Sequence, residues 1–279
     1  MRHHQQCNIA NPSVGLAMEA ERELIALNAF KNKSPPGPFY FVMYGPPGSG
    51  KSAILSLVLG DMGIPTHTLV RVLIDEYIEQ FTSYSAPLAE LKNEWKTNTI
   101  STEDYIDRSE KLYWEIRKEG AEIVEQNVLQ RARENKYHVL KETTGASVSS
   151  LLEKNMLFSR SGYRTVLIYP FVTKATLETR IALRAAETGR YPDPVKLAKQ
   201  VREAQENFLK VYDKFDLVVV IDNEKVFGEG GILVRRVQTA GIEQLEPLYT
   251  TKCNVRQMQE YIKDGSMIAE FAEFIRQQC

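Results

Sequence analysis

A glycine-rich segment near the start of the chain has the composition and spacing of a phosphate-binding loop. It reads GPPGSGKS, with a lysine and a serine directly after the last glycine. Glycines let backbone N–H groups turn inward around a phosphate, and a helix that begins at the lysine directs its positive end at the same anion. The lysine can reach the terminal phosphates, and the serine hydroxyl can ligate Mg²⁺. The segment predicts a site for a nucleoside triphosphate with magnesium, formed by Gly45, Pro46, Pro47, Gly48, Ser49, Gly50, Lys51 and Ser52.

Two acidic residues each stand at the end of a predicted strand. Asp75 follows the run from Leu69 to Ile74, and Glu142 follows the run that begins at Tyr137. At the carboxyl end of a strand, Asp75 can accept a proton from a substrate hydroxyl that attacks a phosphate, or it can cap the helix that follows. Glu142 can orient the hydroxyl or hold metal-bound water, or it is a strand-end residue paired with a neighbour. Thr143 and Thr144 are candidate ligand hydroxyls or plain loop residues.

Arginines gather downstream, where they could stabilise the charge that develops during phosphoryl transfer. Arg180 and Arg184 share one face of a predicted helix, and Arg190 follows in a turn. Arg202 lies further along; the alternative for each arginine is a solvated helix face. Asn223 follows a strand pattern, so it either borders the base of the nucleotide or forms a turn.

The elements that must position these residues alternate between strands and helices. A continuous apolar run, Phe39–Tyr44, leads into the glycine-rich segment, and a helical pattern follows from Ala53. Such a run suits a strand buried on both faces, and strands separated by helices are typical of parallel sheets. We predict an α/β chain with a three-layer P-loop NTPase or kinase fold and a mainly parallel sheet. Its further strands are expected at 69–74, 137–140, 164–169 (stopped by Pro170) and 216–221, and its helices at 102–135 (broken near Gly120), 149–159, 173–187 and 194–212. The helix at 149–159 would place Leu151, Leu152, Met156 and Leu157 inward.

The two ends of the chain differ from this alternating middle. We predict an amphipathic helix over 12–30 and a turn-rich linker, then the core over 39–223, then a C-terminal extension over 224–279. The first helix would place Leu24 and Leu27 inward, and the extension would hold a strand at 232–237 and one helix over 255–278. These ends could dock a partner or support self-association. Between 81 and 108, aromatic residues either shape an acceptor pocket or pack in the core: Tyr84, Trp95 and Tyr105.

Three stretches resemble the zeta-toxin family of P-loop kinases and the related chloramphenicol phosphotransferases. They are FVMYGPPGSGKS at 41–52, VLIDEY at 72–77 and HVLKETTG at 138–145, and the resemblance covers about residues 39–223. It implies ATP as phosphate donor and a small-molecule hydroxyl, such as that of UDP-N-acetylglucosamine, as acceptor. It also implies that Asp75 is catalytic, that Glu142 helps bind the acceptor, and that Arg180 and Arg190 clamp phosphates. The arginine spacing differs from the family's, so Arg184 is an alternative to Arg180.

Composition limits the other possibilities. The 279 residues carry 35 basic and 36 acidic side chains, which disfavours nucleic acid as a partner. No apolar run approaches the ~18 residues of a membrane span, and the start has no secretory pattern. Three widely spaced cysteines favour free thiols and a cytoplasmic location. Two alternatives stay open: a kinase for nucleic-acid ends, and an ATP-binding regulatory module without catalysis. His67 and His138 lack partner motifs, which favours structural roles.

Overall fold

The computed structural model describes residues 12–33, 38–188, 194–224, 232–237 and 255–278. The chain divides into two compact units. The first holds the chain up to Lys31 together with Leu73–Arg131, and the second holds Asn32–Val72 together with the chain from Ala132 onward. The predicted division into extension, core and extension stays a prediction.

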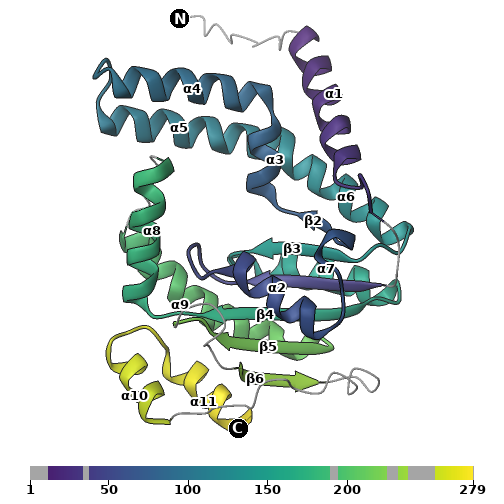
Figure 1. The fold of residues 1–279 in the computed structure, drawn as a ribbon, viewed down its shortest axis with the longest axis vertical. Helices are drawn as coiled ribbons and strands as arrows, with labels where there is room; N and C mark the ends of the chain where they lie inside the picture. Colours follow the sequence, from purple (N-terminus) through teal and green to yellow (C-terminus); the bar gives the residue numbers. More distant parts are fainter. Residues whose placement is uncertain (1–11, 34–37, 189–193, 225–231, 238–254, 279) are drawn as a thin grey trace, which may run out of the picture. The chain divides into compact units, whose positions relative to one another are not determined.

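The second unit is built on a six-stranded sheet with the order β2-β3-β1-β4-β5-β6 (Figure 1). Its neighbours are parallel from β2 to β5, and β6 runs antiparallel to β5. The predicted α/β fold with a mainly parallel sheet is confirmed. The strands are β1 (Phe39–Tyr44), β2 (Val70–Val72), β3 (Val139–Thr143), β4 (Arg164–Phe171), β5 (Leu217–Asp222) and β6 (Ile232–Val237).

Helices cover both faces of this sheet. Successive side chains of β1 point to opposite faces, so β1 packs against helices on both sides. Phe41 and Met43 lie in an apolar cluster with the α2 helix (Lys51–Asp61). Tyr40, on the opposite face, stacks on Phe158 of α7 (Val148–Arg160) with ring centroids 4.1 Å apart. Tyr44 meets Phe208 of α9 (Pro194–Val211) at 5.9 Å. The second unit is therefore a helix–sheet–helix sandwich.

β4 continues through Pro170 to Phe171, so the prediction that Pro170 stops this strand is wrong. The register with β1 ends at Ile168, whereas the register with β5 continues to Phe171. The Phe171 carbonyl accepts from Asn223 on the β5 side, so Pro170, one residue earlier, faces the side where β1 has already ended. The missing N–H of proline therefore costs the sheet no hydrogen bond.

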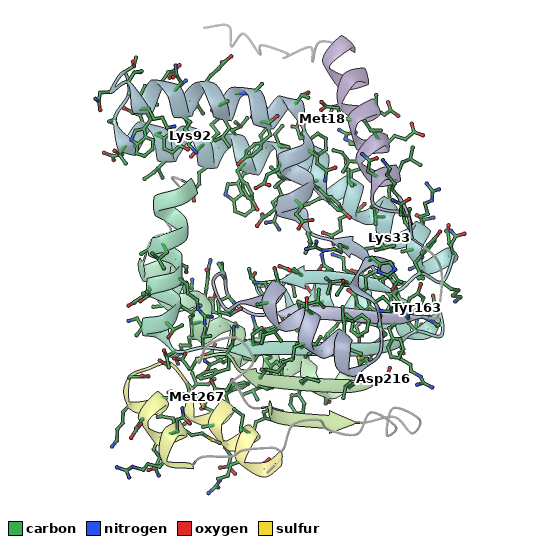
Figure 2. All side chains as sticks on the ribbon, in the orientation of Figure 1. Met18, Lys33, Lys92, Tyr163, Asp216 and Met267 are labelled. Atoms are coloured by element: carbon green, nitrogen blue, oxygen red, sulfur yellow. The ribbon has the colours of Figure 1, made fainter. Side chains whose placement is uncertain are left out.

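A carboxylate ties the starts of β4 and β5 together. Asp216, which is labelled in Figure 2, lies directly before β5. Its carboxylate accepts hydrogen bonds from the backbone N–H of Thr165 at 2.8 Å and from the Thr165 hydroxyl at 3.2 Å. β2 is shorter than predicted, because the chain turns into helix directly after Leu73.

The C-terminal segment forms two helices, α10 (Val255–Lys263) and α11 (Ala269–Gln278), so the prediction of one continuous helix is wrong. The chain breaks at Gly265, whose φ of 76° is left-handed. Phe271 of α11 packs against Tyr169 of β4 and Phe208 of α9, each at 5.4 Å. These helices therefore complete the aromatic core of the second unit.

The first unit is helical. It holds α1 (Pro12–Asn28), α3 (Ile74–Gln80), α4 (Thr82–Lys96), α5 (Thr102–Ile116), a π-helical turn (Arg117–Ala121) and the start of α6 (Glu122–Glu134). The predicted break near Gly120 is the π-helical turn. α8 (Lys174–Thr188) belongs to the second unit, and Thr173 precedes it as predicted, accepting from the Thr176 N–H at 3.3 Å. None of the described helices is long and apolar enough to span a bilayer.

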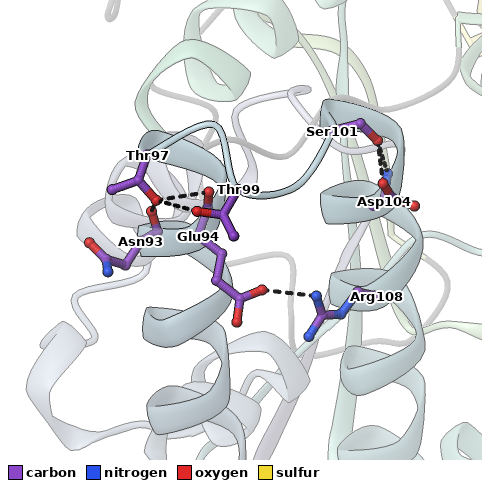
Figure 3. Close-up of polar contacts among 7 residues, drawn as sticks. All are labelled: Asn93, Glu94, Thr97, Thr99, Ser101, Asp104 and Arg108. Atoms are coloured by element: carbon purple, nitrogen blue, oxygen red, sulfur yellow. Dashed lines mark hydrogen bonds and ion pairs between the residues drawn. The ribbon is translucent and has the colours of Figure 1, made fainter.

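α4 and α5 form a hairpin whose connection is fixed by local hydrogen bonds (Figure 3). The Ser101 hydroxyl accepts from the Asp104 N–H at 3.0 Å and so caps α5. Arg108 pairs with Glu94 at 2.9 Å. Inside the hairpin the Trp95 and Tyr105 rings stack at 5.0 Å, and Tyr84 is fully buried. The interpretation of these aromatic residues as packing residues therefore fits the structure.

Two helices turn different faces inward than the sequence predicts. In α1, Leu24 is 59% and Leu27 46% exposed, whereas Ile25 is buried. In α7, Leu151 is buried as predicted, but the predicted core residues Met156 and Leu157 are exposed. Position 155 carries a buried asparagine there instead, and its side chain donates to the Lys214 carbonyl at 2.7 Å. Apolar spacing alone predicted the helices correctly but not their buried faces.

Candidate phosphate-binding site

The predicted phosphate-binding loop connects β1 to α2, as the sequence context requires. Gly50 directly precedes α2 and has a φ of 83°. A Cβ at Gly50 would come within 2.2 Å of the Asn223 side-chain nitrogen, and one at Gly45 within 3.0 Å of the Tyr169 ring. Only glycine fits these two positions without a shift of the neighbours.

Charges and polar groups at the loop suit an anion. The Lys51 ammonium lies against the loop itself, donating to the carbonyls of Gly45 at 3.1 Å and Pro46 at 3.2 Å. The Ser49 hydroxyl is fully buried and has no hydrogen-bond partner within the described part of the chain. No side chain caps the start of α2, so its first N–H groups are available to a ligand. A glycine-lined backbone loop with a lysine over it fits a polyphosphate.

Ser52 and Glu142 meet at the edge of this loop. The Ser52 hydroxyl donates to the Glu142 carboxylate at 3.4 Å across 90 residues of sequence. β3 lies beside β1 in the sheet, with Glu142 opposite Met43, so the end of β3 comes next to the start of α2. Hydroxyl and carboxylate oxygens are ligands that Mg²⁺ accepts when phosphates and waters supply the rest. Across the described ranges, no group of three or more His, Cys, Asp and Glu side chains could hold a metal.

Arg180 and Asn223 hold the loop from the other side. The Arg180 guanidinium donates to the Asn223 carbonyl at 2.9 Å and to the Gly48 carbonyl at 3.5 Å. The Asn223 side chain donates to the Ser49 carbonyl at 2.8 Å. Asn223 is buried, and its side chain holds the loop backbone at the Ser49 carbonyl.

Of the other three predicted arginines, the structure describes the side chain of Arg202 but not those of Arg184 and Arg190. Arg184 belongs to α8, and its side chain is outside the described set; Arg190 lies outside the described residues altogether. Arg202 on α9 forms an ion pair with Glu206 at 2.8 Å and is 74% exposed. The solvated-face interpretation therefore fits Arg202.

Of the two predicted threonines, Thr143 is the last residue of β3, and Thr144 lies in the connecting turn that follows. The Thr143 hydroxyl accepts from the Gly145 N–H at 3.1 Å, and its carbonyl accepts from the Gly45 N–H at 3.1 Å. Thr144 is exposed. Thr143 therefore links this turn to the phosphate-binding loop, whereas Thr144 faces solvent.

Asp75 belongs to the first unit, where it lies in the first turn of α3. The residue at the cap position is Leu73, so the alternative of Asp75 as a side-chain cap does not hold. The Tyr113 hydroxyl donates to the Asp75 carboxylate at 2.7 Å. Burial raises the pKa of Tyr113 to about 12, assisted by the Asp75 charge and hydrogen bond and opposed by Arg117. Tyr113 is therefore a neutral donor near neutral pH.

The structure thus brings together Lys51, Ser52, Glu142, Arg180 and Asn223 in the second unit and describes Asp75 in the first. Sequence reasoning missed Tyr113, the polar partner of Asp75, and Tyr169, which packs beneath Gly45. Tyr113 lies in a long charged helix, and no local pattern indicates a contact 38 residues away. An aromatic residue in a strand beside a glycine-rich loop is the one signal that could have pointed to Tyr169.

Known proteins are similar to this chain in fold, and one family model matches its sequence. The chain is similar in fold to a solved structure of the PezAT chromosomal toxin–antitoxin system of Streptococcus pneumoniae, with 14% identity, a TM-score of 0.59, and coverage of 94% of this chain and 96% of that one. Structures of the AvrRxo1-ORF1:AvrRxo1-ORF2 complex also match, one with sulphate ions (TM-score 0.48) and one with ATP (0.47), each at 12% identity over 96% of this chain and 82% of the other. None of the curated proteins matches. The model of the Zeta toxin family matches residues 25–229, and the chain therefore belongs to that family.

Proposed function

We propose that the chain is an ATP-dependent phosphotransferase that moves the γ-phosphate of ATP to a hydroxyl group of a small molecule. The observation that carries this proposal is the loop between β1 and α2, which has Lys51 over its carbonyls and Ser52 hydrogen-bonded to Glu142. Membership of the zeta toxin family supports it. A loop of this geometry binds phosphates through its backbone, and the chemistry depends on the groups around it.

The residues around the loop have distinct roles in this proposal. Lys51 and Arg180 supply positive charge to the β- and γ-phosphates, and Arg190 and Arg184 are the further arginines proposed to contribute. Ser52, next to Glu142, would hold Mg²⁺. When bound, that ion would neutralise charge on the phosphate oxygens. Asn223 keeps the loop in its phosphate-binding shape.

Asp75 is the proposed general base. It accepts the proton of the acceptor hydroxyl as the oxygen forms a bond to the γ-phosphorus and the bond from that phosphorus to ADP breaks. Glu142, Thr143 and Thr144 are the residues proposed to bind the acceptor. We propose a nucleotide sugar, with UDP-N-acetylglucosamine as the first acceptor to test. The cytoplasm is the compartment in which we expect this reaction.

The proposal is tested by ³¹P NMR of the full chain with ATP, Mg²⁺ and one alcohol at a time. The panel holds UDP-N-acetylglucosamine, nucleosides, aminoglycosides and phenicols, with a 5′-hydroxyl oligonucleotide for the nucleic-acid alternative. A new phosphoester signal that appears together with ADP identifies the acceptor. ADP without a phosphoester would reduce the chain to an NTPase, and no turnover at all would favour the regulatory module.

We also propose that an inhibitory protein controls the chain. The support is its family, together with the PezAT system, which is a toxin–antitoxin pair. Co-expression with proteins encoded next to the chain, followed by co-purification and the ³¹P assay, tests this proposal. An inhibitor should form a stable complex and abolish phosphoester formation. If no neighbouring protein binds, this part of the proposal is wrong.

A further inference from the structure

We propose that Tyr113 is the positioning residue of Asp75: its hydroxyl fixes the orientation in which the carboxylate accepts the substrate proton. This inference rests on the phosphotransferase proposed above. Tyr113 on α5 and Asp75 on α3 are 38 residues apart in sequence, and the distance between their hydrogen-bonded oxygen atoms is 2.7 Å. Within the described residues, Tyr113 is the side chain that donates to the Asp75 carboxylate, and the accepting atom is Oδ1 of Asp75. The bond therefore leaves Oδ2 as the oxygen to be offered to a substrate.

The protonation state of Tyr113 suits this role. Its pKa is raised to about 12, first by burial and then by the charge of Asp75, so the hydroxyl keeps its proton at physiological pH. Arg117 also hydrogen-bonds to Tyr113 and partly opposes the shift. The Arg117 Nε atom donates to Glu122 at 3.1 Å, and its guanidinium lies 4.9 Å from the centre of the Trp114 ring. Tyr113 is thus one member of a polar chain that runs from Asp75 to Glu122.

A close contact between Gly120 and the Phe81 ring fixes the backbone near these polar side chains. Gly120 lies in the π-helical turn, and a Cβ there would come within 2.7 Å of the Phe81 ring. Phe81 is fully buried and joins α3 to α4. The π-helical turn and the end of α3 therefore approach more closely than a larger residue at position 120 would permit. π-Helical turns inside α-helices occur often at functional sites. Here the turn follows Tyr113 by four residues.

Kinetics of matched variants test the inference. The assay uses the full chain, ATP and the panel alcohol that accepts phosphate, beginning with UDP-N-acetylglucosamine. Tyr113→Phe keeps the ring and removes only the hydroxyl, so kcat should fall about 10- to 100-fold while the KM for ATP stays unchanged. Tyr105→Phe removes a hydroxyl from the same helix, where the ring stacks on Trp95, and should keep the wild-type kcat. An unchanged kcat in Tyr113→Phe overturns the inference and leaves the proposed function standing.

A double variant shows whether Tyr113 acts through Asp75. Asp75→Asn should remove most of the turnover, and adding Tyr113→Phe to it should slow the enzyme no further. If the two effects multiply instead, Tyr113 acts independently of Asp75 and is not its positioning residue. A variant whose turnover falls only because less of it is folded would also have a lower melting temperature. The melting temperature of each variant is therefore measured beside its kcat.

A measurement without turnover separates this inference from the proposed function. Tyrosine labelled with ¹³C at Cζ gives one signal that disappears in Tyr113→Phe and so belongs to Tyr113. That signal should shift in Asp75→Asn and stay in place in Asp107→Asn, which alters an exposed acid on the same helix. A signal unmoved by Asp75→Asn excludes the hydrogen bond. If the signal shifts but the wild-type chain phosphorylates no alcohol, the contact is real and the proposed function, with the positioning role built on it, is wrong.

Discussion

The Asn223 side chain donates a hydrogen bond to the Ser49 carbonyl, 174 residues away in sequence, at 2.8 Å. Asn223 follows β5, and Ser49 lies in the loop after β1, two strands away in the sheet. The backbone carbonyl of the same asparagine accepts a hydrogen bond from the Arg180 guanidinium. One residue at a strand end thus connects the loop backbone to an arginine of α8.

Replacing Asn223 with Ala should weaken ATP binding. The Ser49 carbonyl would lose its buried partner, at a cost of about 1–3 kcal/mol, and each 1.4 kcal/mol that reaches the bound state raises the Kd about tenfold. Isothermal titration calorimetry with ATP and Mg²⁺ measures the effect. Asn93→Ala, at an exposed position of α4, is the matched control and should bind as the wild type does. Equal affinity in the two variants would refute the supporting role of Asn223.

Replacing Gly50 with Ala should abolish ATP binding. The new methyl group would meet the Asn223 side chain at 2.2 Å, so the loop must shift. Gly63→Ala is the control, because Gly63 also has a positive φ, 65°, but has open space around its Cβ position. Both variants carry about 1–2 kcal/mol of backbone strain, and only Gly50→Ala should lose the nucleotide in the calorimeter. Loss of binding in both would mean that strain alone is responsible.

Changes at Lys51 and Asp75 should separate binding from catalysis. Lys51→Ala removes the charge over the loop and should raise the Kd for ATP about tenfold or more. Asp75→Asn should leave that Kd nearly unchanged and lower phosphoester formation about 100-fold or more, because it removes the proton acceptor. Titration calorimetry and the ³¹P assay on the same samples give both numbers. Full phosphotransfer by Asp75→Asn would exclude Asp75 as the base.

Acid should destabilise the second unit through His138. Its Nδ1 atom accepts the Phe39 N–H at 3.2 Å, and burial lowers the pKa of His138 below the ordinary 6.5. The unfolded chain therefore takes up this proton first as the pH falls, so the contribution is complete above about pH 6.5 and is lost through the lowered pKa. Melting curves at pH 7.5 and 5.5 should show a smaller drop for His138→Gln than for the wild type. Each kcal/mol corresponds to about 2–4 °C.

The control for this prediction is His67→Gln, which alters an exposed histidine in the 3₁₀ turn after α2. It should melt as the wild type does at both pH values. A pH dependence that is the same in all three proteins would show that other groups are responsible.

The sheet and its loop could be predicted because their signals are local. The signal lies within residues 39–51, which hold a continuous apolar strand followed by three glycines and a lysine. The structure has β1, the loop and α2 in that order. The π-helical turn at Gly120 was also visible as a helix break. Strand ends were less certain, since Pro170 continues a strand only because β1 has already ended beside it.

The contacts that complete the site could not be predicted because they join distant segments. Ser52 with Glu142, Asn223 with Ser49, and Tyr113 with Asp75 are set by sheet order and helix packing rather than by spacing. The buried face of α7 was mispredicted for a related reason. An asparagine is buried there with a carbonyl partner from a distant turn, which a pattern of apolar residues does not include.

The aromatic core next to Gly45 connects the C-terminal helix α11 to the phosphate-binding loop. Phe271 packs on Tyr169, and Tyr169 fills the space that a side chain at Gly45 would need. A fragment that ends before α11 would keep the glycine-rich motif and Tyr169 but would lose Phe271, which packs against that ring. The C-terminal helix α11 is therefore expected to contribute to the rigidity of a loop more than 200 residues before it, through a single tyrosine ring.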